Sequence, residues 1–209
     1  MVIDEVGAED GAYEIAKKVF AADIEAIQST LEMLDAAAFV AAVDLLGAAR
    51  RIEVYGIGSS GPVATDAYYR LLRLGMRVGV ATDAHMQAVG ASLLEQGDVA
   101  LVVSHTGRTV ETLNTARIAR AAGAKVLAVT SFLDAPLAEH ADLLLVAATA
   151  ETAYRTEAMA SRIAHLSIVD ALYVALAHRG GLRSAQVLQR TGDIIEERRV
   201  AAHHHDQQP

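Results

Sequence analysis

Five short apolar runs are the feature that most constrains the fold of this 209-residue chain. They lie near residues 52–55, 76–81, 98–103, 125–130 and 142–147, and they are continuous rather than alternating. Continuous runs of this length are typical of strands that are covered on both faces of a parallel sheet. Segments with helical spacing separate them, near residues 61–74, 85–94, 108–122 and 135–140. The sequence therefore predicts an α/β fold, a three-layer αβα sandwich with a five-stranded parallel sheet and right-handed crossovers.

Helical segments flank this pattern on both sides. Residues 1–11 are expected to be a flexible acidic start, and residues 12–50 a two-helix lead or linker in which Asp35 caps the second helix. We expect the sheet domain and its C-terminal helices to occupy residues 51–200. One long helix is predicted from about 154 to 178, closed by Gly180 and Gly181, and a final helix from about 184 to 200. Residues 201–209, with three consecutive histidines, read as a flexible tail rather than a metal site.

Composition excludes several classes of function. The chain has no cysteine, so disulfides, thiolate catalysis and cysteine-based zinc sites are excluded. No apolar run approaches the roughly 18 residues that a membrane helix needs, and the first residues lack the pattern of a secretory signal, so we expect a cytoplasmic protein. The net charge is −8, and arginine and lysine are scattered rather than gathered in a stripe. Direct binding of DNA by this chain is therefore not expected.

Two glycine- and hydroxyl-rich segments follow two of the predicted strands. They are residues 56–61 (GIGSSG) and residues 104–109 (SHTGRT), and each leads into a segment with helical spacing. Such loops lie at the carboxyl ends of parallel strands, where open α/β sheets bind ligands. Helix N-termini there offer free N–H groups and a partial positive charge, which favour phosphate. The pair of loops predicts a small phosphorylated ligand that is held from two sides.

The first loop alone permits another interpretation. Residues 56–61 match the G-x-G-x-x-G pattern of dinucleotide-binding domains, and Asp83 follows the next predicted strand, where a ribose contact would be needed. The second loop argues against this, because a dinucleotide site does not need Ser104, Thr106 and Thr109 together after its third strand. A phosphate cradle uses such hydroxyls. Helix capping by Thr106 or Thr109 remains the simpler alternative for that loop.

Several motifs together resemble a known family. Residues 55–61 (YGIGSSG), 104–109 (SHTGRT) and 124–130 (AKVLAVT) resemble the sugar isomerase (SIS) domain over about residues 36–180. Residues 82–85 (TDAH), 157–166 (EAMASRIAHL) and 170–172 (DAL) look like the RpiR/MurR family of bacterial transcriptional regulators. In that family an SIS domain senses a sugar phosphate, and an N-terminal helix-turn-helix domain precedes it. Nothing in this sequence matches that DNA-binding domain.

The resemblance implies roles for individual residues. The phosphate ligands that it implies are Ser59, Ser60, Ser104, His105, Thr106 and Thr109. The residues implied to face the sugar are Asp83, His85 and Glu157, although Asp83 can equally be a helix cap and His85 a surface residue. A glutamate at a place comparable to Glu157 acts as the base in SIS isomerases. His165 lies among apolar residues and is more readily explained as a core or interface histidine.

The function expected from this resemblance is a non-catalytic, sugar-phosphate-binding effector domain of a regulator. The alternative is a stand-alone aldose–ketose sugar-phosphate isomerase with Glu157 as base and His85 or His165 as the second acid–base group. Neither function needs a cofactor or a metal. The apolar lead and the long C-terminal helix favour a homodimer or homotetramer.

Overall fold

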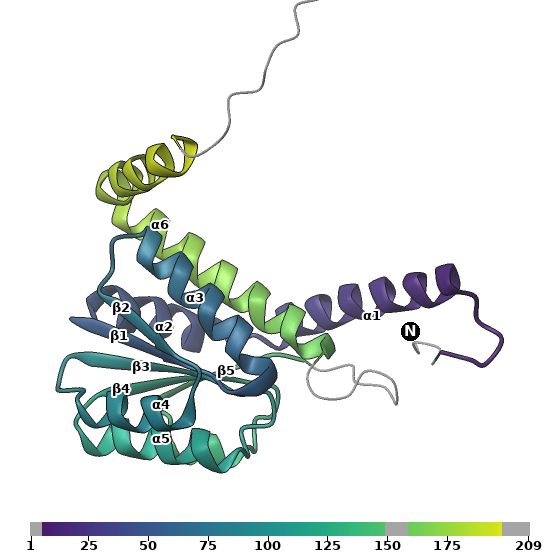
Figure 1. Cartoon of the computed structure of the whole chain (residues 1–209), viewed down its shortest axis with the longest axis horizontal. Coiled ribbons are helices and arrows are strands. Elements are labelled where there is room, and N and C mark those ends of the chain that lie inside the picture. The colour runs from purple at the N-terminus through teal and green to yellow at the C-terminus, as the bar shows by residue number, and fades with distance from the viewer. Residues whose placement is uncertain (1–5, 149–158, 198–209) are drawn as a thin grey trace, which may run out of the picture.

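Five parallel strands form the centre of the structure, a computed structural model that describes residues 6–148 and 159–197 (Figure 1). The strands are β1 (Arg51–Tyr55), β2 (Val78–Ala81), β3 (Asp98–Val103), β4 (Lys125–Thr130) and β5 (Leu143–Val146). Their order in the sheet is β2-β1-β3-β4-β5, and every neighbouring pair is parallel. The predicted fold class is confirmed, because each of the five apolar runs contains one strand.

Helices cover both faces of this sheet. One face carries α2 (Ala36–Ala48), α3 (Gly61–Arg73) and α6 (Met159–Glu196). The other carries α4 (Ala84–Ser92), α5 (Val110–Ala121) and the 3₁₀-helix η2 (Pro136–His140). Figure 1 shows α1 (Ala12–Met33) extending away from these layers, with its C-terminal part beside α6.

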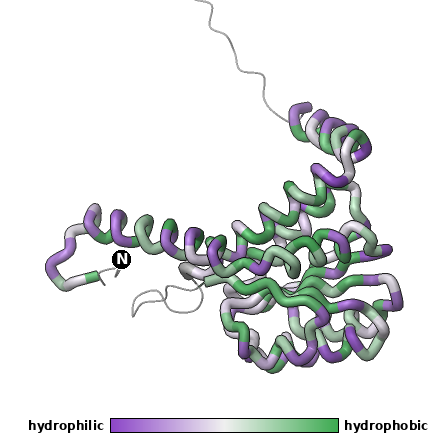
Figure 2. The backbone as a smooth tube through the Cα atoms, turned by 180° about the vertical axis from the view of Figure 1, so that it is seen from behind, coloured by the Kyte–Doolittle hydropathy of each residue, from purple (hydrophilic) through white to green (hydrophobic). Residues whose placement is uncertain are grey.

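Alternation along the central strands builds a separate core on each face. In β3, Leu101 and Val103 pack towards α2, α3 and α6, whereas Ala100 and Val102 pack towards α4 and α5. All four side chains are buried, so both faces of the strand are apolar. Figure 2 shows the strands as a hydrophobic centre and α1 as a helix of mixed character. The continuous apolar runs of the sequence thus have a direct physical cause.

The strand order determines where a ligand can bind. β1 lies between β2 and β3, so the chain moves in one direction from β1 to β2 and in the other from β3 to β4. The helices that follow β1 and β3 consequently lie on opposite faces, α3 on one and α5 on the other. Ligands of open α/β sheets bind in the crevice that such a reversal leaves at the carboxyl ends of the strands. Both hydroxyl-rich loops begin there.

The C-terminal helices follow the prediction. The sequence predicts an end at Gly180 and Gly181 and a new helix after them, and α6 consists of two helices that meet at a kink, where the backbone of Gly181 is not helical. Gly181 has φ +52° and ψ −130°, a conformation that glycine adopts far more easily than other residues. The two parts of α6 therefore run in different directions (Figure 1). The predicted tail at 201–209 and the predicted helix start at 154 lie outside the described residues.

A membrane span is not found in the ranges 6–148 and 159–197. None of the helices there has both the length and the apolar character needed to cross a bilayer.

Gly56 fixes the turn between β1 and the first loop, and we expect it not to tolerate a side chain. A Cβ at this position would lie 2.6 Å from the Ser60 carbonyl oxygen and 2.9 Å from the Ala64 Cβ. We expect Gly56→Ala to lower the free energy of unfolding by about 1–3 kcal/mol, the usual cost of overpacking. Gly192→Ala in α6 meets no atom within 4 Å and should raise stability by up to about 1 kcal/mol. Urea denaturation measures both, and equal effects would contradict this account.

Candidate functional site

The two hydroxyl-rich loops leave the sheet side by side. Tyr55 at the end of β1 pairs with Val102 of β3, so the chain enters residues 56–61 and 104–109 from adjacent strand ends. Adjacent strands lie about 5 Å apart. The 3₁₀-helix η1 (Gly58–Ser60) carries the first loop into α3, and α6 contacts η1 from the side. The sequence prediction that both loops share one edge of the sheet is correct at the level of the backbone.

The first loop presents a serine at the N-terminus of α3. Ser60 occupies the N-cap position of that helix, but its side chain makes no capping hydrogen bond. Its residue is buried, whereas Ser59 is exposed. Pro62 lies in the first turn of α3, where its missing N–H would lack an intrahelical partner in any case. The Gly61 N–H bonds to the Gly58 carbonyl, and the Ser60 side chain does not cap the N–H groups that follow Pro62.

The second loop is organised by its own hydroxyls. The Gly107 N–H donates to Ser104 Oγ at 3.2 Å, and the Arg108 N–H donates to Thr106 Oγ1 at 3.2 Å. Each hydroxyl accepts in these bonds, so its O–H can still be donated to another acceptor. Thr109 occupies the N-cap position of α5 without a side-chain capping bond. Capping, the simpler alternative for this loop, is therefore not how Thr109 or Thr106 is used.

Gly107 holds this loop against η2. Its φ is +59°, and a Cβ would lie 2.6 Å from the Ala135 Cβ. Its carbonyl accepts a hydrogen bond from the Leu137 N–H at 3.1 Å. The loop therefore has a rigid support on the side away from β1.

Two buried histidines lie behind the second loop and are joined through a serine. His105 Nδ1 lies 3.0 Å from Ser131 Oγ, and the same oxygen lies 3.1 Å from His165 Nε2. Ser131 follows β4, and its N–H donates to the His105 carbonyl at 2.9 Å. Thr130 Oγ1 donates to that carbonyl as well, at 3.0 Å. His105 is thus fixed by β4 and, through Ser131, by α6.

The loop after β2 completes this edge of the sheet. Asp83 caps α4 by accepting a hydrogen bond from the Met86 N–H at 2.9 Å, and His85 is exposed in the first turn. The capping alternative for Asp83 is therefore realised, and a contact with a sugar stays a prediction. A shallow depression of about 740 Å³ lies between the first loop and this one, with Gly58, Gly61 and Thr82 in its wall. Ser60, Ser104 and Thr109 do not line it.

Two predicted features of the site have a different status. Glu157 lies outside the described residues. Within the described part of the chain, no group of three or more histidine, cysteine or carboxylate side chains is placed to hold a metal.

The family model described as the SIS domain matches residues 45–175. The chain belongs to the SIS family. The match includes both loops and all five strands.

Relatives of this SIS chain include regulators of transcription. An uncharacterised HTH-type transcriptional regulator from Caldanaerobacter subterraneus is 32% identical over 195 residues, which cover 93% of this chain and 69% of the relative. The NanR protein of Vibrio vulnificus, complexed with ManNAc-6P, has a TM-score of 0.82 at 27% identity and covers 91% of this chain, which in turn covers 70% of NanR. The sugar isomerase domain of an RpiR transcription factor from Sphaerobacter thermophilus has a TM-score of 0.79 at 27% identity, with 86% and 99% covered. The resemblance to RpiR-type regulators is confirmed.

Sequence reasoning missed two polar residues of this SIS domain. Gln87 is fully buried on α4, and its amide donates to the carbonyls of Gly56 and Ala81, at 3.1 and 2.8 Å. It therefore ties the ends of β1 and β2 together. Ser131 was also missed, although the rule that located Ser104, a hydroxyl residue just after a strand, applies to it as well.

Burial determines the protonation state of His165. Desolvation, together with the proximity of His105, lowers its pKa from the ordinary value of 6.5 to about 4, although a hydrogen bond with the Thr130 backbone opposes the shift. Neutral His165 that donates to Thr130 keeps Nε2 as an acceptor for the Ser131 O–H. Ser131 Oγ then accepts from His105 Nδ1–H. These proton positions are assigned from the bonding network.

This pKa shift predicts how stability depends on pH. Between pH 6.5 and pH 4 the unfolded chain binds a proton at His165 and the folded chain does not. The free energy of unfolding is therefore highest above pH 6.5 and decreases as the pH falls towards 4. Between pH 7 and pH 5 this decrease in the free energy of unfolding amounts to about 2 kcal/mol. Urea unfolding at both values should show a smaller pH dependence for His165→Gln than for the unchanged chain. The same dependence in both would mean that His165 is protonated in the fold.

Proposed function

We propose that this chain binds a phosphorylated monosaccharide between the loops after β1 and β3, and that the binding serves sensing in a transcriptional regulator. One observation carries the binding proposal. Ser60 and Thr109 each occupy the N-cap position of a helix, yet neither side chain makes a capping hydrogen bond. Two hydroxyls at two adjacent helix N-termini are thus available to one anion.

The phosphate is held by neutral donors in this proposal. Backbone N–H groups at the starts of α3 and α5 supply the partial positive charge of the helix termini. Hydroxyls of Ser59, Ser60, Ser104, Thr106 and Thr109 supply O–H donors, and the backbone of His105 lies in the same loop. This arrangement suits a chain whose net charge of −8 opposes an anion at long range, because the attraction is local.

The sugar is proposed to extend towards the loop after β2. Asp83 uses one carboxylate oxygen, Oδ1, for its cap, so Oδ2 can accept from a sugar hydroxyl. His85, two residues after Asp83, is exposed. Glu157 belongs to the same predicted set of sugar ligands. The complex of the related NanR with ManNAc-6P supports a sugar phosphate as the class of ligand.

A second copy of the chain is the proposed partner. Large apolar side chains of α1 lie exposed, among them Phe20 at 70% and Leu31 at 73%, and Val40 of α2 is exposed at 59%. Large apolar side chains exposed on a helix that projects from the domain are expected to be covered by another surface. We propose that α1 and its neighbours form the contact of a homodimer or homotetramer, and that the protein works in the cytoplasm as such regulators do.

The phosphate cradle can be tested by calorimetry with matched ligands. We expect ManNAc-6P or another sugar phosphate to bind far more tightly than the same sugar without phosphate. Thr109→Val should weaken binding about 10- to 100-fold, which corresponds to about 1–3 kcal/mol for a hydrogen bond to a charged group.

Thr191→Val provides the matched control, because it makes the same change on α6, where the hydroxyl bonds to the Leu188 carbonyl. It should leave the affinity unchanged. Equal binding of phosphorylated and plain sugars would remove the phosphate cradle. Unchanged affinity in Thr109→Val would remove that hydroxyl from it.

Exchange of a substrate proton separates the sensor from the alternative isomerase. An isomerase removes a proton from the carbon next to the carbonyl and requires a base within reach. We expect no deuterium at that carbon after any bound sugar phosphate is incubated with the chain in D₂O and examined by NMR. Exchange that Glu157→Gln abolishes would make the protein an isomerase with Glu157 as its base, while the binding result above would still hold.

A further inference from the structure

A cavity of about 730 Å³ lies at the end of the sheet opposite to both loops. The segments that precede β1 and β2 form one side of it, and α6 forms the other on both sides of the kink at Gly181. Its size is within the range of pockets that bind small molecules. Of the predicted phosphate and sugar ligands that the structure describes, none lines it.

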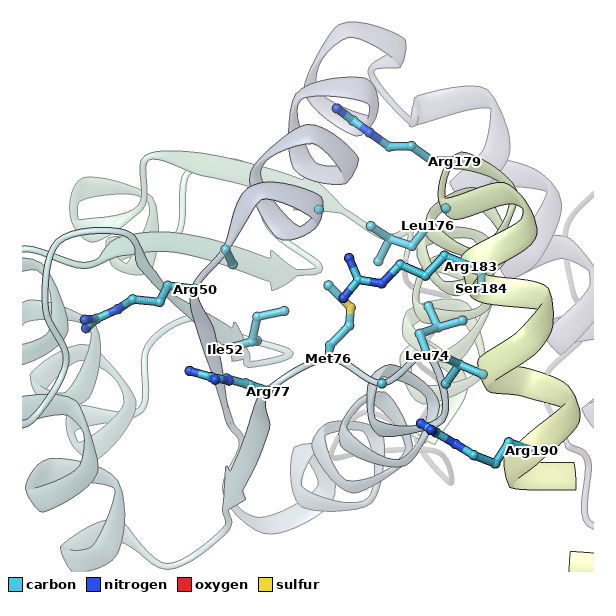
Figure 3. A pocket seen from close by; sticks show the side chains of 15 residues that line it. Arg50, Ile52, Leu74, Met76, Arg77, Leu176, Arg179, Arg183, Ser184 and Arg190 are labelled. Carbon is cyan, nitrogen blue, oxygen red and sulfur yellow. The ribbon is translucent and has the colours of Figure 1, made fainter. Parts of the chain in front are cut away.

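Arginine dominates the polar part of this cavity. Five arginines line it, Arg50, Arg77, Arg179, Arg183 and Arg190, and no carboxylate of the described residues does. Figure 3 shows Arg183 and Arg190 extending from α6, with Arg50 and Arg77 on the side of the sheet. A cluster of this kind is unusual in a chain whose net charge is −8.

Two of the five arginines already have partners. Arg50 donates to Asp98 at 3.0 Å and to Glu95 at 2.7 Å. The hydrogen bond from Arg50 lowers the pKa of Asp98, so this carboxylate stays ionised beside it. Arg179 pairs with Asp44 of α2. These two guanidinium groups are neutralised by the protein itself.

Within residues 6–148 and 159–197, Arg77, Arg183 and Arg190 make no ion pair. Glu53, a carboxylate near Arg77, is held by Arg51 at 2.6 Å. A favourable position at a helix C-terminus explains Arg77, which follows the end of α3, but not Arg183 or Arg190, which lie within α6. Arg183 and Arg190 therefore face the cavity without a counter-charge, whereas the Arg77 side chain extends toward Arg50 and lines a separate depression with Glu53, Glu95 and Asp98 (Figure 3).

The wall between these charges is apolar. Ile52, Leu74, Met76, Leu176 and Val187 contribute side chains to it. An apolar wall under a rim of guanidinium groups matches a ligand with an apolar body and a multiply charged end. Guanidinium groups form bidentate bonds to phosphate and carboxylate and stack on aromatic faces.

We propose that this cavity is a second ligand site, and that it binds a small organic polyanion of the nucleoside polyphosphate class. Arg183 and Arg190 of α6 would hold the charged end, and the apolar wall would hold the base. The ligand would bridge the edge of the sheet and the part of α6 that follows the kink. The site is separate from the sugar-phosphate loops, so the two proposals fail independently.

Calorimetry on the whole 209-residue chain tests this site, with ATP without magnesium as the probe and adenosine as its uncharged match, at low ionic strength. We expect ATP to bind and adenosine to bind at least about tenfold more weakly. The double variant Arg183→Ser/Arg190→Ser should lose at least about tenfold in affinity for ATP, as expected when charge-assisted bonds are removed.

Two controls make the result specific. Arg117→Ser/Arg120→Ser on α5 removes the same charge from another face and should leave the affinity for ATP unchanged. Thr109→Val should leave it unchanged as well. Equal losses in the two double variants would show non-specific attraction, and a loss in Thr109→Val would show that ATP occupies the sugar-phosphate loops. Either result, or no binding of ATP, would overturn the proposal.

Discussion

The reversal of strand order between β1 and β3 is the constraint on which the rest of this structure depends. It sends α3 and α5 to opposite faces, so the two helix N-termini that follow these strands diverge from a shared edge. The backbone of both loops is then committed to that edge, where Gly56 and Gly107 admit contacts too close for a side chain. Hydroxyl residues in the two loops can face one ligand because the order of the strands already places the loops next to each other.

The two proposed anion sites lie at opposite ends of the sheet and attract an anion with different groups. At the carboxyl edge, helix N-termini and neutral hydroxyls supply the attraction, and no formal charge is needed. At the amino edge, α2 and α3 end with their carbonyl groups, which repel an anion. Any anion site there must rely on full charges, and the arginines around the second cavity are such charges. The direction of the parallel strands therefore dictates which residue types each end requires.

The strands and the two loops could be predicted from sequence because local patterns determine them. Burial on both faces makes β3 and β4 continuously apolar, and glycines mark the turns that follow. Features that depend on distant pairs gave no local signal. His105, Ser131 and His165 meet across separations of 26 and 34 residues. The unused capping capacity of Thr109 is likewise visible only in three dimensions.

The chain of hydrogen bonds from His105 through Ser131 to His165 explains why the second loop holds its shape. In the tautomers assigned above, the Ser131 hydroxyl serves once as donor and once as acceptor, and this pattern requires a neutral His165. A proton on Nε2 of His165 would turn that nitrogen into a donor and leave the Ser131 hydroxyl facing two donors. Burial prevents this at neutral pH by lowering the pKa of His165 to about 4. The same burial that costs the histidine its charge therefore fixes β3, β4 and α6 in one arrangement around the proposed phosphate site.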